Sequence, residues 1–231
     1  PDAMPFKTGL TFTYDSGEFE KNMDLALEMS DYGNFESRRE QAKANGMLRG
    51  IGVSNTIERA AAAGIEAAEI RVDRSGTVTI LSGSCTQGQG HETVYKQIVC
   101  DKLGLKPEDV SYIWGDTDKV AFGHGAGGSR SATLGGSAVL MATDKIIDKA
   151  TKIAAHQLEA AVEDIEFHEG TFAVAGTDKT LNFAEIAKAA IAPATVPNGM
   201  EPGLNEQATY TAEIMNYPNG CHVCEIEIDP D

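Results

Sequence analysis

The sequence has few basic residues, no long apolar run and few cysteines, and each shortage excludes a class of protein. Its 231 residues include 19 Lys and Arg against 35 Asp and Glu, which gives a formal net charge of −16 at pH 7. A nucleic-acid binder needs a basic surface that displaces counterions from phosphates, so we expect no binding to DNA or RNA. No stretch approaches the roughly 18 consecutive apolar residues that span a bilayer, so we expect no membrane segment.

The four cysteines are too few for a disulfide scaffold in a chain of this length. Such sparse cysteine is typical of a reducing compartment, and we expect a cytoplasmic protein. The sequence starts at Pro1 without an initiator Met, so we interpret the chain as a piece of a longer protein.

Hydrophobic periodicity predicts an α+β fold (mixed α/β) with helices packed on mixed sheets. We expect residues 1–46 to form a helical segment packed on the main unit. Residues 47–231 would form one α/β domain, with residues 192–205 as a Pro-rich connector. The last two predicted strands, 208–214 and 221–229, are joined across Pro218-Asn219-Gly220, which is a hairpin-type turn sequence.

A first glycine-rich loop, Gln87-Gly88-Gln89-Gly90-His91, lies between a predicted strand and a predicted helix. Glycines let backbone N–H groups approach a ligand, and the helix start adds free donors and a positive dipole end. The two glutamine amides can both donate and accept hydrogen bonds, which favours a nitrogen-rich ring over a bare phosphate. The alternative is a tight turn whose glutamines face solvent.

A second loop, Gly123-His124-Gly125-Ala126-Gly127-Gly128-Ser129-Arg130-Ser131, precedes a long helix rich in small residues. Its backbone amides, hydroxyls and guanidinium suit a pyrophosphate. Three of its glycines also satisfy the G-x-G-x-x-G dinucleotide pattern. The context does not fit a Rossmann domain, because a long loop separates this run from the preceding strand and no second strand with an acid follows the helix.

Other candidate sites are weaker. Asp116 and Asp118 are better explained as turn residues than as metal ligands. Cys221 and Cys224 resemble half of a zinc site, but three positions apart in a strand they point to opposite faces. We interpret the four cysteines as core residues. No spacing of Ser, His and Asp indicates a hydrolase triad.

Several motifs occur together in a fixed order. They are Tyr14-Asp15-Ser16-Gly17, Arg49-Gly50-Ile51-Gly52, Gln87-Gly88-Gln89-Gly90-His91-Glu92-Thr93, Gly115-Asp116-Thr117-Asp118, Gly127-Gly128-Ser129-Arg130-Ser131 and the terminal segment 222–230. In these motifs the sequence resembles the molybdopterin-binding large subunit of the molybdenum hydroxylases, the family of xanthine dehydrogenase and aldehyde oxidase. It is most similar to the bacterial branch of aerobic carbon monoxide dehydrogenase and aldehyde oxidoreductase large chains.

The resemblance implies a molybdenum–molybdopterin cofactor, which the family also uses in a cytosine dinucleotide form. It implies iron–sulfur and FAD-binding partner subunits or domains, a small-molecule substrate and, in the complete protein, a homodimer of heteromers. Carried over by position, ten residues would hold the cofactor: Gln87, Gly88, Gln89, Gly90, His91, Thr93, Gly128, Ser129, Arg130 and Ser131.

The family's catalytic glutamate and its substrate-side loop have no counterpart in this sequence, so we assign no catalytic residue and no metal ligand. We expect the chain alone to bind no cofactor and to be inactive. The substrate class stays open among carbon monoxide, aldehydes and N-heterocycles. Two alternatives also stay open: a non-enzymatic assembly or binding module derived from the family, and a Rossmann-type dehydrogenase.

Overall fold

The computed structural model describes residues 3–61, 64–213 and 215–230. The chain divides into two compact units. Unit 1 combines residues 1–60 with residues 215–231, and unit 2 comprises residues 61–214. The two units are therefore divided differently from the split after residue 46 that the sequence suggests.

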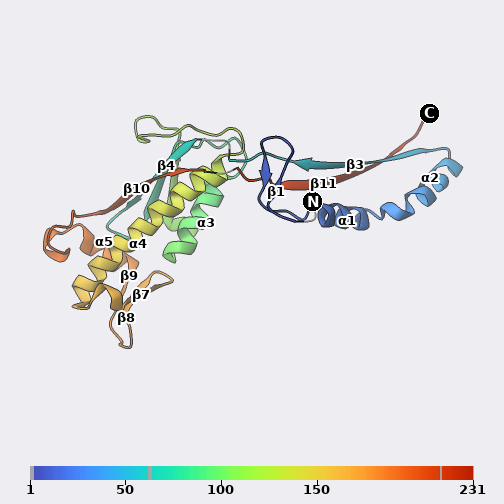
Figure 1. Cartoon of the computed structure of the whole chain (residues 1–231). Helices are drawn as coiled ribbons and strands as arrows, with labels where there is room; N and C mark the ends of the chain where they lie inside the picture. Colours follow the sequence, from blue (N-terminus) through green and yellow to red (C-terminus); the bar gives the residue numbers. More distant parts are fainter. Residues whose placement is uncertain (1–2, 62–63, 214, 231) are drawn as a thin grey trace. The chain divides into compact units, whose positions relative to one another are not determined.

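Unit 1 is built on a long two-stranded antiparallel ribbon of β3 (Leu48–Ile57) and β11 (Asn219–Ile228). Ten consecutive residue pairs join the two strands, from Leu48 with Ile228 to Ile57 with Asn219. The ribbon explains why the two ends of the chain form one unit, since among the described residues the strand that pairs with β3 comes from the far end of the chain. Helices α1 (Phe19–Met29) and α2 (Phe35–Ala44) run along it, and β1 (Phe6–Lys7) pairs with β2 (Thr13–Tyr14) (Figure 1).

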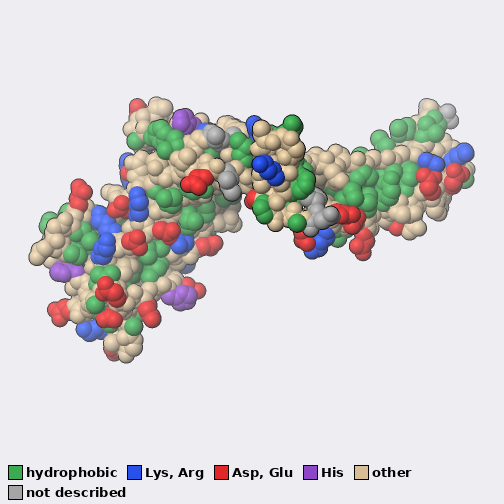
Figure 2. Space-filling view, viewed as in Figure 1, with side chains coloured by type: hydrophobic (Ala, Val, Ile, Leu, Met, Phe, Trp, Pro, Cys, Tyr) green, Lys and Arg blue, Asp and Glu red, His purple; other side chains and the backbone are tan. Residues whose placement is uncertain are grey.

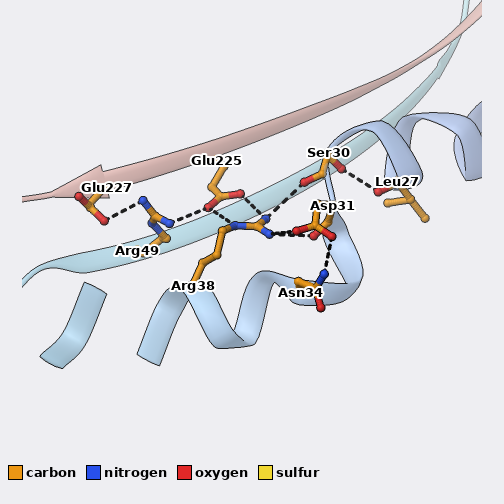
Figure 3. Close-up of polar contacts among 8 residues, drawn as sticks. All are labelled: Leu27, Ser30, Asp31, Asn34, Arg38, Arg49, Glu225 and Glu227. Atoms are coloured by element: carbon orange, nitrogen blue, oxygen red, sulfur yellow. Dashed lines mark hydrogen bonds and ion pairs between the residues drawn. The ribbon is translucent and has the colours of Figure 1, made fainter. Parts of the chain in front are cut away.

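A chain of ion pairs fastens α2 to this ribbon (Figure 3). Arg38 of α2 donates Nε and Nη2 to the two carboxylate oxygens of Glu225 on β11, at 3.0 and 2.7 Å. Its Nη1 also contacts Asp31 Oδ2 at 2.8 Å. Arg49 of β3 continues the chain, with contacts of 3.4 Å to Glu225 and 2.8 Å to Glu227. The hydrogen bond from Arg38, with smaller contributions from the charges of Arg38 and Arg49, lowers the pKa of Glu225.

Replacing Arg38 with glutamine is expected to lower the melting temperature of unit 1 at neutral pH and to flatten its acid dependence. A carboxyl with a depressed folded pKa adds stability above its unfolded pKa, about 4.3 for Glu, and that stability is lost as the pH falls through the folded value. The melting temperatures of wild type and Arg38→Gln, measured by calorimetry over a series of pH values, should therefore converge in acid. Arg39→Gln is the matched control, because the described contacts of Arg39 lie within α2: an ion pair with the exposed Glu36 and a position 5.8 Å from the centroid of the Phe35 ring. A difference in melting temperature between the Arg38 variant and wild type that stays constant with pH would contradict the expectation.

Unit 2 centres on a mixed four-stranded sheet in the order β10-β4-β5-β6. Its strands are β4 (Ile65–Val72), β5 (Val78–Ser82), β6 (Val110–Trp114) and β10 (Leu204–Thr211). β4 is antiparallel to both β10 and β5, whereas β5 and β6 are parallel because α3 (His91–Leu103) crosses between them. A tight turn at residues 73–77 joins β4 to β5, with the Asp73 amide donating to the Thr77 carbonyl at 2.9 Å.

Two helices cover the sheet and form the core with it. The long α4 (Gly136–Leu158) packs on β4 and β10 and lies beside α3 (Figure 1). Its buried stripe includes Ala142, Ile146, Ala150 and Ile153, which follow one another at helical spacing. Helix α4 also packs against α5 (Phe183–Ala190) and a small three-stranded sheet. The strands of this sheet are β7 (Ile165–His168), β8 (Thr171–Val174) and β9 (Thr180–Asn182).

The structure confirms the mixed α and β fold, and it shows a capping box at the start of α5. Asn182 Oδ1 accepts from the Glu185 amide at 2.9 Å, and Glu185 Oε2 accepts from the Asn182 amide at 2.8 Å. The hairpin expected at Pro218-Asn219-Gly220 is wrong: β10 pairs with β4 and β11 pairs with β3, in different units. Short-range turn chemistry indicates a reversal of the chain there, but which strands pair is decided by long-range contacts.

The cysteine prediction holds only in part. Cys221 and Cys224 both lie in β11, where their odd and even positions place them on opposite faces. Cys100 is buried as expected, but Cys224 is exposed and Cys85 and Cys221 are half-buried, so the assignment of all four to the core is wrong. Among the described residues, no group of three or more His, Cys, Asp or Glu side chains is placed to hold a metal ion.

The surface of the chain shows mixed charge. Figure 2 shows Lys and Arg interspersed with Asp and Glu on the visible face of unit 2. In the described part of the chain no helix is both long and apolar enough to cross a membrane.

Candidate functional site

The first glycine loop connects β5 to α3 in unit 2. Gly90 adopts φ = 78° at the N-cap of α3, a left-handed conformation that glycine reaches without strain. The side chains of Gln87 and Gln89 contact each other, with Gln89 Nε2 donating to Gln87 Oε1 at 3.1 Å. Gln89 Oε1 also accepts from the Gln87 backbone amide. The loop therefore holds two amide side chains next to a helix start whose first turn carries backbone donors.

His91, the first residue of α3, is buried beside Tyr95. It is only 6% exposed, and its ring stacks on that of Tyr95, with centroids 5.8 Å apart and an interplanar angle of 7°. Its Nδ1 is buried and has no hydrogen-bond partner among the described residues. A buried polar atom without a partner is costly, and it indicates a group that a ligand would satisfy.

The second glycine loop leads from β6 into α4 through one turn of π-helix, Ser131–Gly135. Ser129 adopts a left-handed backbone with φ = 51°, which is unusual for a residue with a side chain. The Tyr95 hydroxyl, fully buried on α3, donates to the Ser131 carbonyl at 2.7 Å. This hydrogen bond ties the head of α4 to α3, directly beside the first loop.

The two loops line one pocket of about 420 Å³. Its walls are formed by Gln87, Gln89, His91, Val94, Tyr95, Ala126, Gly127, Ser129, Arg130, Ser131 and Ala132. Six of the ten residues named from the sequence are among them: Gln87, Gln89, His91, Ser129, Arg130 and Ser131. Gly88, Gly90 and Gly128 belong to the same two loops but do not line the pocket. Thr93, in the first turn of α3, is exposed and does not line it either.

Arg130 is held in place by β4, which the sequence analysis did not connect with the site. Its Nη2 donates to the Ile65 carbonyl at 2.7 Å and lies 3.4 Å from Glu66 Oε2. Glu66 is fully buried, and Oε2 also accepts from the His124 backbone amide at 3.3 Å. The ring Nδ1 of His124 lies 3.0 Å from the Ile65 carbonyl. Two residues of β4 thus hold both ends of the second loop.

Two glycines make room for the buried carboxylate. A Cβ on Gly83 would lie 2.7 Å from the Gly123 Cα, and a Cβ on Gly123 would lie 2.7 Å from Glu66 Oε1. The loops after β5 and β6 therefore touch backbone to backbone above Glu66. The sequence did hold a signal: extending the alternation of Ala68 and Ile70 back by one step places Glu66 on the buried face of β4.

The dinucleotide-binding interpretation of the second loop does not fit this topology. After β6 and the loop, α4 leads to the separate β7-β8-β9 sheet and not to a strand beside β6. A Rossmann unit needs a parallel strand there to complete the nucleotide site.

Comparison with known proteins identifies the family. A sequence profile of the molybdopterin cofactor-binding domain matches residues 25–231. The gamma subunit of the 6-hydroxypseudooxynicotine dehydrogenase complex of Paenarthrobacter nicotinovorans is 34% identical, over 99% of this chain and 29% of its own length. The carbon monoxide dehydrogenase large chain of Hydrogenophaga pseudoflava is also 34% identical, over 99% of this chain and 30% of its own length.

A solved structure shows the same fold. The crystal structure of quinoline 2-oxidoreductase from Pseudomonas putida 86 matches with a TM-score of 0.89 at 34% identity, over 99% of this chain and 31% of that one. The chain thus spans about 30% of the length of these relatives. The profile match and the structural match confirm the predicted resemblance: the chain belongs to the molybdopterin cofactor-binding domain family.

Proposed function

We propose that the pocket between the two glycine loops binds the pterin part of a molybdenum–molybdopterin cofactor, as part of a molybdenum hydroxylase. The observation that supports this most directly is the buried Nδ1 of His91, unpartnered among the described residues, in a pocket that both loops line. The pocket volume of about 420 Å³ is in the range of small-molecule sites.

The chemistry of the lining residues fits a pterin. A pterin ring presents acceptor nitrogens, a carbonyl and an amino group along its edge, so it needs donors and acceptors side by side. Gln87 and Gln89 offer both through their amides, Ser131 offers a hydroxyl, and His91 offers a ring nitrogen. The two glutamines hydrogen-bond each other in this structure and would exchange that contact for the ligand. Gly88, Gly90, Thr93 and Gly128 would contact parts of the cofactor beyond the pocket.

The bound cofactor would supply the molybdenum centre that takes two electrons from the substrate. The residues of this chain would bind and orient the pterin and keep water from its edge, and none of them is assigned a catalytic or metal-ligating role. For the complete protein we propose hydroxylation of an aldehyde, an N-heterocycle or carbon monoxide in the cytoplasm. The electrons taken from the substrate would pass to iron–sulfur and FAD-binding partners in a homodimer of heteromers. The cofactor would be in its cytosine dinucleotide form.

The two alternatives are not favoured by the comparisons. The matched relatives are named as dehydrogenases and an oxidoreductase, so they offer no support for a non-enzymatic module. A Rossmann-type dehydrogenase requires a further parallel strand next to β6, and the described part of the chain has none there.

The chain alone is expected to retain no molybdenum through purification and to be inactive. A cofactor held between distant segments loses most of its contacts when those segments are missing. A pterin in millimolar excess should nevertheless occupy the pocket. Metal analysis and an activity assay of the purified chain test the first expectation, and bound molybdenum or hydroxylation by residues 1–231 would contradict it.

Titration with the fluorescent, uncharged 6-hydroxymethylpterin tests the pocket itself. Replacing His91 with phenylalanine keeps the ring stack but removes the nitrogen, and Gln89→Ala removes an amide. Each is expected to weaken binding by about tenfold, because a buried hydrogen bond to the ligand is lost. Gln97→Ala, on the exposed side of α3, is the control and should bind as wild type. Failure of the wild-type chain to bind, or equal binding by all variants, would contradict the proposal.

A further inference from the structure

Glu66 is a buried carboxylate that the proposed function leaves unused. It is fully buried, and its two oxygens accept from the Ala67 amide at 3.3 Å and the His124 amide at 3.3 Å. Its Oε2 also lies 3.4 Å from Nη2 of Arg130, whose side chain is 13% exposed. A buried charge persists only where a partner compensates it, so the guanidinium and the carboxylate stabilise each other.

Arg130 and Glu66 together set the net charge at the pocket. Arg130 is the one Lys or Arg among the described residues that line it. Its charge would make the pocket attractive to anions, but the carboxylate of Glu66, 3.4 Å from Nη2, offsets that charge. Nε of Arg130 remains buried without a partner among the described residues, so the side chain keeps one donor that is not engaged. The pocket is thus rich in hydrogen-bonding groups and close to neutral.

We propose that Glu66 is a positioning and specificity-determining residue: by compensating and anchoring Arg130, it makes the pocket select an uncharged hydrogen-bonding ring over a polyphosphate. This rests on the proposed function, because it assigns the ring end of the cofactor, and not its phosphate end, to the pocket. It also gives a reason for glycine at positions 83 and 123, because a Cβ at either position would crowd the carboxylate of Glu66.

The test compares two probes, 6-hydroxymethylpterin and inorganic pyrophosphate, by calorimetric titration of the full chain at constant salt. Glu66→Gln leaves an uncompensated guanidinium, so the ratio of pyrophosphate to pterin affinity should rise by tenfold or more. Arg130→Gln leaves an uncompensated carboxylate, so the same ratio should fall. Glu69→Gln is the matched control on the same strand, where Glu69 pairs with Arg71, and the ratio should stay at the wild-type value.

The ratio of the two affinities separates a role of Glu66 in specificity from a role in folding alone. A role of Glu66 in folding alone would weaken both probes together, and an unchanged ratio in a folded Glu66→Gln chain would overturn the inference. If circular dichroism shows that Glu66→Gln does not fold, Arg130→Gln decides: a ratio shifted toward the pterin supports the inference, and an unchanged ratio overturns it. A wild-type chain that binds no pterin contradicts the proposed function instead, so the two failures are distinguishable.

Discussion

Replacing Gly104 with alanine is expected to destabilise unit 2 by roughly 2–5 kcal/mol, the sum of a left-handed backbone cost and of overpacking. Gly104 ends α3 with φ = 67°, where its amide bonds the Cys100 carbonyl at 2.9 Å. A Cβ there would lie 2.3 Å from the Glu169 carbonyl carbon and 2.4 Å from the Gly170 amide nitrogen. These are backbone atoms of the β7–β8 turn, so relief requires moving that turn away from the end of α3.

Gly176→Ala separates the two causes. Gly176 has a similar backbone angle, φ = 72°, but a Cβ there meets nothing within 4 Å. This control should therefore lose only about 1–2 kcal/mol, the backbone part alone. Urea unfolding followed by the fluorescence of Trp114 measures both, because this single tryptophan lies in β6 of unit 2. Equal losses for the two variants would show that the close contact at Gly104 is not significant.

Gly135→Ala is expected to destabilise unit 2 by roughly 2–5 kcal/mol, from overpacking and from a buried carbonyl left without its donor, and to weaken pterin binding as well. A Cβ on Gly135 would lie 2.2 Å from the Tyr95 hydroxyl oxygen. Tyr95 is fully buried and must move, which breaks its hydrogen bond to the Ser131 carbonyl and shifts the ring that stacks on His91. The change thus reaches both loops of the pocket.

The neighbouring glycine is the control. A Cβ on Gly136 has only ordinary contacts, 3.5 Å to Ile98 and 4.0 Å to Tyr95, so Gly136→Ala should be neutral or stabilise the helix by up to about 1 kcal/mol. The double variant Gly135→Ala with Tyr95→Phe removes the clashing oxygen, and its loss should be smaller than the sum of the two single losses. Urea unfolding and pterin titration measure these effects, and strict additivity would refute the proposed clash.

Much of the local structure could be predicted from the sequence because it depends on residues close in the chain. The capping box of Asn182 and Glu185, the helix end at Gly104 and the turn after β4 are set by neighbouring residues. The two glycine loops were recognised for the same reason, since a strand, a glycine run and a helix start occur in sequence order.

Long-range pairing could not be predicted in the same way. The pattern of β11 indicates a strand, but nothing in it specifies β3, more than 160 residues earlier, as the partner. The division into two units follows from that pairing, because β11 joins the C-terminal residues to the N-terminal ones. The sequence patterns do not connect Glu66 with the site, because Glu is seldom fully buried and only the folded structure shows that this one is.

The order of the residues alone determined the family, the two glycine loops and the donors and acceptors that they carry. Only the tertiary structure decided that both loops line one pocket, that His91 in its wall has a buried ring nitrogen without a partner among the described residues, and that Glu66 compensates Arg130. The physical reason is that turn and helix preferences act over a few residues. Burial, charge compensation and the shape of a cavity arise only when distant strands and helices pack together.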